Sequence, residues 1–171
     1  MRLGEICTLR KEDLQSVDGI PCFLIRPHTE TGWAPKTEAG IRMVPVHSKL
    51  IEAGVLALKN TTDGSYLIPC LETSKQGTRG AALGRAFSLL KTRIGLPAEI
   101  TFHSFRHTVS TQLRNADVNI RELWIDCLLG HEATHKSQGT TTYLTGISTA
   151  NLRQTVEAIS YPETAFANMT I

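Results

Sequence analysis

Hydrophobic residues recur every three or four positions in six stretches of the chain, which is the pattern of helices that bury one face. The stretches are residues 2–14, 48–59, 80–94, 103–115, 120–129 and 149–159. In the third stretch, Leu83, Phe87, Leu90 and Ile94 form a single stripe, which we expect to pack into the core. The fifth stretch ends at Gly130, a residue type that commonly terminates helices. The pattern therefore predicts a mainly helical protein.

Two shorter segments have the composition of β-strands. Residues 22–26 and 41–46 are rich in aliphatic and aromatic side chains, and a polar connection with glycine and proline separates them. The simplest arrangement is an antiparallel hairpin whose connection presents Lys36. Combined with the helices, it predicts an α+β fold, a mainly α-helical domain with a small antiparallel β-sheet.

The composition is that of a chain that folds. The 171 residues are 41% hydrophobic, enough to fill a single core, and 20% charged, with acidic and basic residues nearly balanced. We expect one domain over residues 1–160, followed by a short tail over residues 161–171. The formal net charge of +2 permits a nucleic-acid partner without requiring one.

The cysteines and the hydropathy argue against a secreted or membrane-spanning protein. Cys7, Cys22, Cys70 and Cys127 are scattered without a C-x-x-C pair, and no signal peptide precedes them. We therefore expect reduced thiols rather than a disulfide framework or a zinc ribbon. The longest apolar stretches are far shorter than the roughly 20 residues that cross a bilayer. These features predict a soluble, cytoplasmic protein.

Several polar residues are candidates for chemistry, although each has a structural interpretation when it is taken alone. Arg2 and Glu5 lie one helical turn apart, which is the spacing of a surface ion pair. Lys36, in its polar connection, is typical of a solvent-exposed lysine. Tyr66 and Tyr161 have turn-like or terminal contexts, which favour structural roles.

Two pairs of histidines raise the alternative of a metal site. His103 and His107 are four positions apart, and so are His131 and His135, a spacing that would place both rings of a pair on one face of a helix. No H-E-x-x-H pattern and no convergent pair of cysteines accompanies them. We therefore expect no metal ion at these histidines.

Five short segments, taken together and in order, change the interpretation of these residues. They are Arg2-Leu-Gly-Glu5, Pro35-Lys36-Thr37, His103-Ser-Phe-Arg106, Leu129-Gly130-His131 and Thr142-Tyr143. The series resembles the motifs of the phage integrase family, the tyrosine recombinases, over about residues 2–162. H-x-x-R alone would be a weak signal, whereas H-S-F-R-H-T followed by L-G-H and a downstream tyrosine is specific. The resemblance implies the DNA breaking-rejoining fold of integrases.

The resemblance also implies site-specific DNA recombination through a covalent 3′-phosphotyrosyl intermediate. Tyr143 is the implied nucleophile, and its attack on a phosphodiester releases a 5′-hydroxyl. The covalent link keeps the energy of the phosphodiester, so the implied reaction needs neither ATP nor another cofactor, and no metal. Arg2 and Arg106, permanently charged and fork-shaped, would bind the non-bridging phosphate oxygens.

The remaining motif residues have implied roles in proton transfer and support. A tyrosine hydroxyl has a reference pKa of about 10, so it needs a proton acceptor, for which His103 is the candidate. Lys36 is the candidate general acid for the leaving 5′-oxygen, and His131 would donate a hydrogen bond to the phosphate. Glu5 would orient Arg2 or brace the site.

Partners and alternatives complete the interpretation. The implied partner is double-stranded DNA, on which family members act as tetramers and often pass a C-terminal segment to a neighbouring subunit. The resemblance also implies a protein of the bacterial cytoplasm, encoded by a bacterium or by a phage. Family members carry an N-terminal DNA-clamping domain and a further helix before the first arginine. We expect this segment to lack that part and not to be fully active alone. The main alternative is a non-catalytic DNA-binding or interaction remnant of a truncated integrase. A type IB topoisomerase shares the chemistry, but Leu-Gly-His favours a recombinase.

Overall fold

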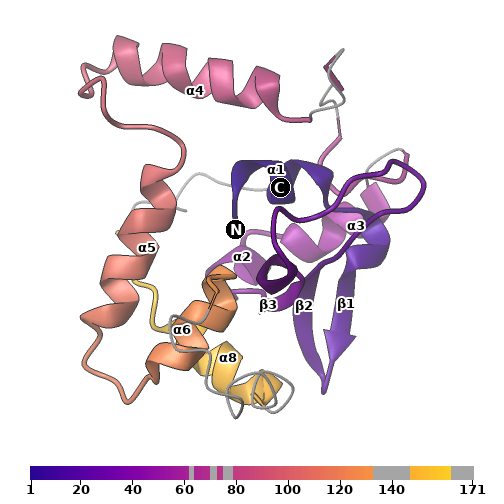
Figure 1. Ribbon diagram of the computed structural model, residues 1–171, viewed down its shortest axis with the longest axis vertical. Coiled ribbons are helices and arrows are strands. Elements are labelled where there is room, and N and C mark those ends of the chain that lie inside the picture. The colour runs from indigo at the N-terminus through magenta and orange to yellow at the C-terminus, as the bar shows by residue number, and fades with distance from the viewer. Residues whose placement is uncertain (62–63, 70–72, 75–78, 133–146, 163–171) are drawn as a thin grey trace.

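The computed structural model describes residues 1–61, 64–69, 73–74, 79–132 and 147–162. The strands are β1 (Leu14–Val17), β2 (Ile20–Ile25) and β3 (Arg42–Pro45). The α-helices of the described residues are α1 (Leu3–Thr8), α2 (Ser48–Glu52), α3 (Leu58–Thr61), α4 (Ala81–Arg93), α5 (Ser104–Arg114), α6 (Glu122–Leu129) and α8 (Thr149–Glu157). Short 3-10 helices are η1 (Lys11–Asp13), η2 (Glu38–Gly40) and η3 (Val55–Ala57). The predicted α+β class, mainly helical with a small sheet, is confirmed (Figure 1).

The strands form one antiparallel sheet in the order β1, β2, β3. Leu14 of β1 pairs with Phe23 of β2, and the two strands are joined by Asp18 and Gly19. The φ angles of these two residues, 51° and 77°, suit the two-residue turns that close β-hairpins. The antiparallel pairing of β2 with β3 confirms the predicted hairpin. Strand β1 was not predicted, and its first residue falls at the end of the longer helix expected over residues 2–14.

Two hydrophobic clusters make up the core. One lies between the sheet and the helices that follow it, and comprises Leu9, Leu14, Phe23, Ile25, Val46, Val55 and Leu67. The other joins α5, α6 and α8, and comprises Leu113, Ile125, Leu128, Leu129 and Val156. Val44 of β3 packs against both clusters. The molecule therefore has a sheet half and a helical half, and β3 lies between them (Figure 1).

The connection between β2 and β3 is folded rather than a tight turn. A β-bridge joins His28 to Trp33, and η2 precedes β3. The Nε2 atom of His28 lies 2.8 Å from Oδ2 of Asp13, and both side chains are buried, which anchors the start of the connection to the body of the protein. Lys36 is exposed. The connection thus presents Lys36 to solvent, as predicted.

The helices expected after the sheet are present, with one interruption. The helix expected over residues 48–59 is broken at Gly54, whose φ of 92° is left-handed, into α2, η3 and α3. The helices expected over 103–115, 120–129 and 149–159 correspond to α5, α6 and α8. Gly130, with a φ of 67°, ends α6 as predicted.

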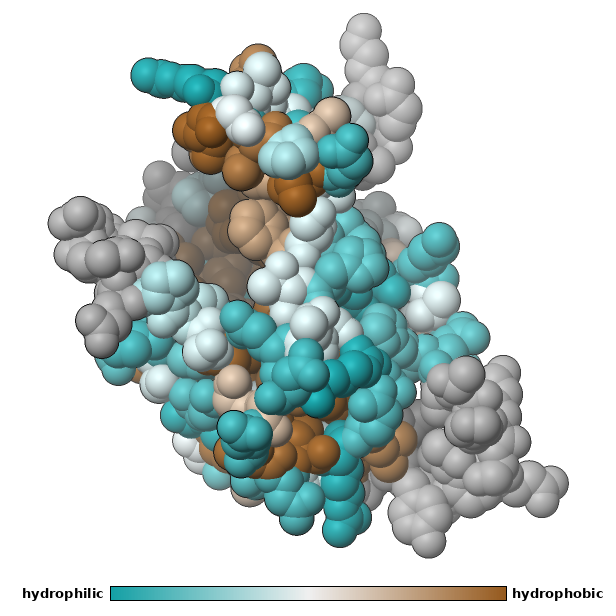
Figure 2. All heavy atoms as spheres, turned by 90° about the vertical axis from the view of Figure 1, so that its left-hand side faces the viewer, coloured by the Kyte–Doolittle hydropathy of each residue, from teal (hydrophilic) through white to brown (hydrophobic). Residues whose placement is uncertain are grey.

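Helix α4 is where the prediction of a buried stripe is wrong. None of its residues is buried, and Leu90 and Ile94 are 53% and 59% exposed. Phe87 stacks with Phe102 and Phe105, each at a ring-centroid distance of 5.5 Å. Figure 1 shows α4 crossing one end of the molecule, and Figure 2 shows hydrophobic residues gathered on it and beside it. Periodicity predicted the apolar face correctly, but it does not say what covers that face.

Two expectations from the composition can be compared with the structure. In the described residues the cysteines are free thiols, with Cys7 and Cys22 buried and Cys127 half-buried, while Cys70 lies outside them. Burial raises the pKa of the Cys22 thiol to about 11, so it is protonated at neutral pH. No helix in the described part of the chain combines the length and the apolar composition that crossing a membrane requires.

Candidate active site

A cluster of charged side chains lies where α1, β3 and the end of α6 meet. Its centre is Glu5, which is 3% exposed. Glu5 Oε1 accepts hydrogen bonds from Arg2 Nη1 at 3.0 Å and from Arg42 Nη1 at 3.2 Å. Its Oε2 accepts from the backbone N–H of Arg2 at 2.7 Å and from Arg42 Nη2 at 2.8 Å. One buried carboxylate therefore holds two arginines, and the Arg2–Glu5 pair is not the surface ion pair that the spacing alone suggests.

The carboxylate of Glu5 is held in its charged form. Burial acts to raise its pKa, but the hydrogen bonds and charge of Arg42, together with the backbone N–H of Arg2, outweigh burial and lower the pKa of Glu5 to about 2. Glu5 is therefore ionised at neutral pH. It fits the predicted role of orienting Arg2, and it also pairs with an arginine that was not among the predicted site residues.

Arg42, the first residue of β3, is the residue that the sequence interpretation missed. Its Nε donates to the carbonyl oxygen of Leu128 at 2.9 Å, and its Nη1 donates to that of Gly40 at 2.7 Å. The side chain is 2% exposed. A permanently charged residue in a segment that otherwise has the pattern of a buried strand must find acceptors, and this signal could have identified it.

Gly130 allows the end of α6 to approach Arg42 closely. A Cβ atom at Gly130 would lie 2.9 Å from Arg42 Nη1 and 3.0 Å from the carbonyl oxygen of Ala39. The φ of 67° at Gly130 is also left-handed, a conformation that favours glycine. The glycine of Leu129-Gly130-His131 is thus required both by the backbone turn and by the arginine packed against it.

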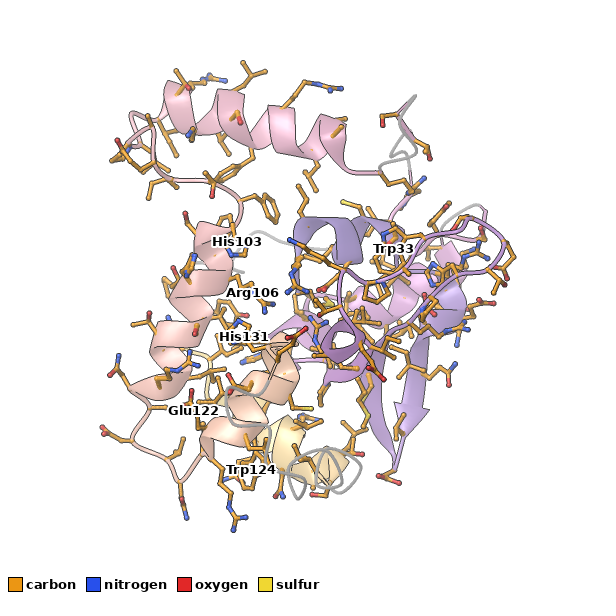
Figure 3. All side chains as sticks on the ribbon, viewed as in Figure 1. Trp33, His103, Arg106, Glu122, Trp124 and His131 are labelled. Atoms are coloured by element: carbon orange, nitrogen blue, oxygen red, sulfur yellow. The ribbon has the colours of Figure 1, made fainter. Side chains whose placement is uncertain are left out.

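Arg106 of α5 joins the cluster from the helical half. Its side chain donates a hydrogen bond from Nη2 to the carbonyl oxygen of Leu129, and its buried Nη1 has no hydrogen-bond partner among the described residues. Burial, and then the charges of Arg2 and Arg42, lower the pKa of Arg106 to about 10. Arg106 is still protonated at neutral pH, but its charge is disfavoured where it lies. Figure 3 shows Arg106 on the side of α5 that faces α1.

Two histidines border the arginines. His103 caps the start of α5, and its pKa is lowered by burial and then by the charges of His107, Arg106, Arg2 and His131. His103 is therefore neutral at pH 7 and able to accept a proton. The charges of the predicted Arg2, Arg106 and His131 thus act on His103. Figure 3 shows His103 and Arg106 close together on α5.

His131 follows α6 and is oriented by Asp126. The Nδ1 atom of His131 lies 3.2 Å from Oδ1 of Asp126, and the His131 backbone N–H donates to the Asp126 carbonyl oxygen at 3.0 Å. Arg114 Nη2 donates to the same Oδ1 at 3.3 Å. Asp126 was not predicted to contribute to the site.

An open pocket of about 390 Å³ adjoins the cluster. It is lined by Arg2, Thr37, Arg114, Glu122, Asp126, Gly130, His131 and Glu132. Lys36 is not among the lining residues, and its neighbour in the chain, Thr37, is. Among the predicted residues, Arg2 contacts Glu5 and lines the pocket together with His131, and Arg106 binds the carbonyl of Leu129, two residues before His131.

The predicted nucleophile, Tyr143, lies outside the described residues. The other two tyrosines have contacts elsewhere. The Tyr66 ring lies 3.6 Å below the guanidinium of Arg79, and Tyr161 packs edge-on against His47 at 5.1 Å between ring centroids. Both contacts agree with the structural roles expected for Tyr66 and Tyr161.

The alternative of a metal site concerns two pairs of histidines, of which the structure describes the first. The rings of His103 and His107 are 4.8 Å apart between centroids and nearly perpendicular. The described residues contain no group of three or more His, Cys, Asp or Glu side chains arranged to hold a metal ion. His135, the partner of His131 in the second pair, lies outside them.

Comparison with known proteins identifies the family of this chain. A family model described as "Phage integrase family" matches residues 1–144, which is most of the chain. No curated protein and no solved structure matches it. Because this match covers more than half of the chain, the chain belongs to the phage integrase family of site-specific tyrosine recombinases.

Proposed function

We propose that this chain is the catalytic domain, over residues 1–160, of a site-specific recombinase that cleaves and rejoins DNA through a 3′-phosphotyrosyl bond to Tyr143. The observation that supports it most is the environment of Arg106. Arg106 is 7% exposed as a residue, lies among other cations, and has a buried Nη1 without a partner in the described part of the chain. An arginine in this state is prepared for an anionic ligand.

The electrostatics favour a phosphate as that ligand. Arg2 and Arg42 both pair with the carboxylate of Glu5, and burial, followed by repulsion from these two arginines, lowers the pKa of Arg106. A phosphate diester bound beside Arg2 and Arg106 would offset this repulsion and supply the acceptor that Arg106 Nη1 lacks. Phosphoryl transfer needs mainly such positioning and neutralisation of charge on the equatorial oxygens.

Strand cleavage would proceed by in-line displacement at phosphorus. His103, neutral at pH 7, takes the proton of the Tyr143 hydroxyl, and the phenolic oxygen forms a bond to phosphorus. The bond between phosphorus and the 5′-oxygen breaks, and Lys36 gives that oxygen a proton. His131, oriented by Asp126, donates a hydrogen bond to a non-bridging oxygen. Rejoining is the reverse reaction with the 5′-hydroxyl of another strand.

The proposal extends to partners. Double-stranded DNA is the substrate, and the active assembly on DNA is a tetramer in the cytoplasm of a bacterium. The tail over residues 161–171 contacts a neighbouring subunit. Deleting it should weaken tetramer formation on DNA, measured by native gel or mass photometry, whereas an unchanged tetramer would contradict this part of the proposal.

A suicide substrate tests the central claim. A duplex with a nick just downstream of the cleavage site loses its short 5′-hydroxyl fragment, so the covalent adduct accumulates. We expect an adduct that survives SDS and is removed by protease. It should be absent in Tyr143→Phe and present in the matched control Tyr161→Phe, because Tyr161 packs against His47 instead.

The same assay decides between the proposal and the non-catalytic alternative. DNA binding without an adduct, in the chain and in any longer form that carries it, would mean a DNA-binding protein that no longer cleaves. An adduct that persists in Tyr143→Phe would reject the assigned nucleophile. Relaxation of supercoiled plasmid by a monomer, without exchange of strands between duplexes, would instead indicate a topoisomerase.

A further inference from the structure

The side chain of Arg42 forms hydrogen bonds with three separate parts of the molecule. It connects α1 through Glu5, the β2–β3 connection through Gly40, and the end of α6 through Leu128. The contact with Leu128 spans 86 positions of sequence. This single side chain thus joins the sheet half of the molecule to the helical half.

Arg42 is placed to act on other residues rather than on a substrate. Its side chain is 2% exposed, and each of its three guanidinium nitrogens already donates to Glu5, Gly40 or Leu128. A DNA phosphate could reach it only by displacing one of these acceptors. Any effect of Arg42 on strand cleavage must therefore pass through its neighbours.

On one side, Arg42 fixes the position of Arg2. Each oxygen of the Glu5 carboxylate accepts one hydrogen bond from Arg42 and one from Arg2. The two bonds from Arg42 therefore set the position and the plane of the carboxylate, and the carboxylate in turn sets the guanidinium of Arg2. Arg42 also keeps Glu5 ionised by its charge, which maintains the ion pair to Arg2.

On the other side, Arg42 fixes the end of α6. The last carbonyl groups of a helix lack intrahelical partners and carry partial negative charge. The carbonyl of Leu128 accepts from Arg42 and that of Leu129 accepts from Arg106, and His131 follows two residues later. Two neighbouring carbonyls therefore hold the two arginines side by side, at a fixed distance from His131.

We propose that Arg42 is a positioning residue that sets Arg2, Arg106 and His131 in the mutual arrangement that binds the scissile phosphate. This inference rests on the proposed recombinase function and adds a residue to it. Lysine at position 42 would keep the charge but could not donate at once to Leu128 and to both oxygens of Glu5. The variant Arg42→Lys should therefore disturb the arrangement without removing any group that contacts DNA.

Single-turnover cleavage of the nicked duplex tests the proposal. We expect Arg42→Lys to slow adduct formation roughly 10- to 100-fold, the usual range for residues that orient ligating groups, with a smaller effect on DNA affinity. The matched control is Arg26→Lys, because Arg26 also pairs with two carboxylates, those of Glu12 and Asp13, away from the site. The control should cleave at nearly the wild-type rate.

A substrate with less charge separates positioning from simple loss of stability. When a methylphosphonate replaces the scissile phosphate, the transition state carries one negative charge fewer and depends less on correctly placed guanidiniums. The rate ratio between wild type and Arg42→Lys should shrink several-fold on this substrate. An equal defect on both substrates, or a wild-type rate for Arg42→Lys on the phosphate, would overturn the proposal.

Amide hydrogen exchange keeps the test independent of activity. In Arg42→Lys we expect exchange to quicken at Gly130 and His131 and to stay unchanged in the sheet at Phe23. Exchange that quickens equally at all three residues would indicate a general structural role and overturn the inference. Failure of the wild-type chain to form an adduct would reject the proposed function, and the exchange pattern would still decide whether Arg42 sets this arrangement.

Discussion

The Nδ1 atom of His131 lies 3.2 Å from a carboxylate oxygen of Asp126, and this pair determines which ring nitrogen of His131 can face a substrate. Because Nδ1 is the ring nitrogen that contacts Asp126, Nε2 is directed away from this carboxylate. Arg114, which also binds Glu122, holds the carboxylate in place. A ring held in this orientation can present Nε2 to a phosphate.

We predict that Asp126→Asn lowers the rate of adduct formation roughly 10-fold, because the contact that orients the ring of His131 is weakened. Nitrogen-15 NMR of His131 should show a changed Nδ1 signal in the variant, because Nδ1 is the atom that contacts residue 126. Glu122→Gln is the control, since Glu122 contacts Arg114 and not His131. A wild-type rate in Asp126→Asn would contradict this role.

Replacement of Arg2 or Arg106 by lysine should strongly reduce the rate of DNA cleavage, although lysine keeps the positive charge. A lysine ammonium is a point charge and cannot contact two phosphate oxygens in the plane of a guanidinium. We expect Arg2→Lys and Arg106→Lys each to reduce the cleavage rate by about 10²–10³, the range for removing a donor to transition-state charge. Arg153→Lys, which alters only the pair with Glu157, is the control. Equal rates in all three variants would reject direct phosphate binding.

Stability at acidic pH should report the buried ion pairs of Glu5. The pKa of Glu5 is lowered from 4.5 to about 2 in the folded protein, so the unfolded chain binds more protons between these values. The contribution of Glu5 is therefore complete above about pH 4.5 and is lost as the pH falls towards 2. Urea unfolding at several pH values should give a steeper loss for wild type than for Glu5→Gln in this window. Parallel curves would contradict the assignment.

Sequence patterns predicted the helices and strands that have a clear local signal, such as a regular hydrophobic period or a terminating glycine. The helices around Arg106 and before Gly130 have a regular period and a clear stop, and both were found within a few residues of the expected bounds. Strand β1 is too short for a periodic signal, although Asp18-Gly19 between apolar residues was a usable hairpin signal. The stripe of α4 shows the limit of periodicity, because burial depends on which other elements pack against it.

For the candidate site, the sequence motifs identified candidate residues but not the contacts that fix the positions of their side chains. Arg2, Glu5 and Arg106 were predicted from their short patterns, and the structure connects them through contacts between distant segments. The shared use of Glu5 by Arg42 follows no local spacing rule, whereas the support of His131 by Asp126 spans only the glycine end of α6. Arg42 and Leu128 are 86 positions apart, and only the packing of β3 against α6 brings them together. Tyr143 lies outside the described residues, so its approach to the arginines remains a prediction.

Gly130→Ala should be more harmful than a substitution at a comparable helix end. A left-handed φ alone costs an alanine about 1–2 kcal/mol. At Gly130 the added Cβ would also press on Arg42 Nη1 and on the Ala39 carbonyl, at 2.9 Å and 3.0 Å, and Arg42 cannot yield without breaking its bonds to Glu5 and Leu128.

Gly95→Ala is the matched control for this last prediction, because Gly95 follows α4 with a φ of 73°, and a Cβ atom added there would meet no described atom within 4 Å. Urea unfolding should show the strain cost in both variants and an additional loss only in Gly130→Ala. Because the contact falls on Arg42, Gly130→Ala should also slow adduct formation, whereas Gly95→Ala should not. Equal losses of stability and unchanged cleavage in both variants would mean that the end of α6 and Arg42 are not tightly packed.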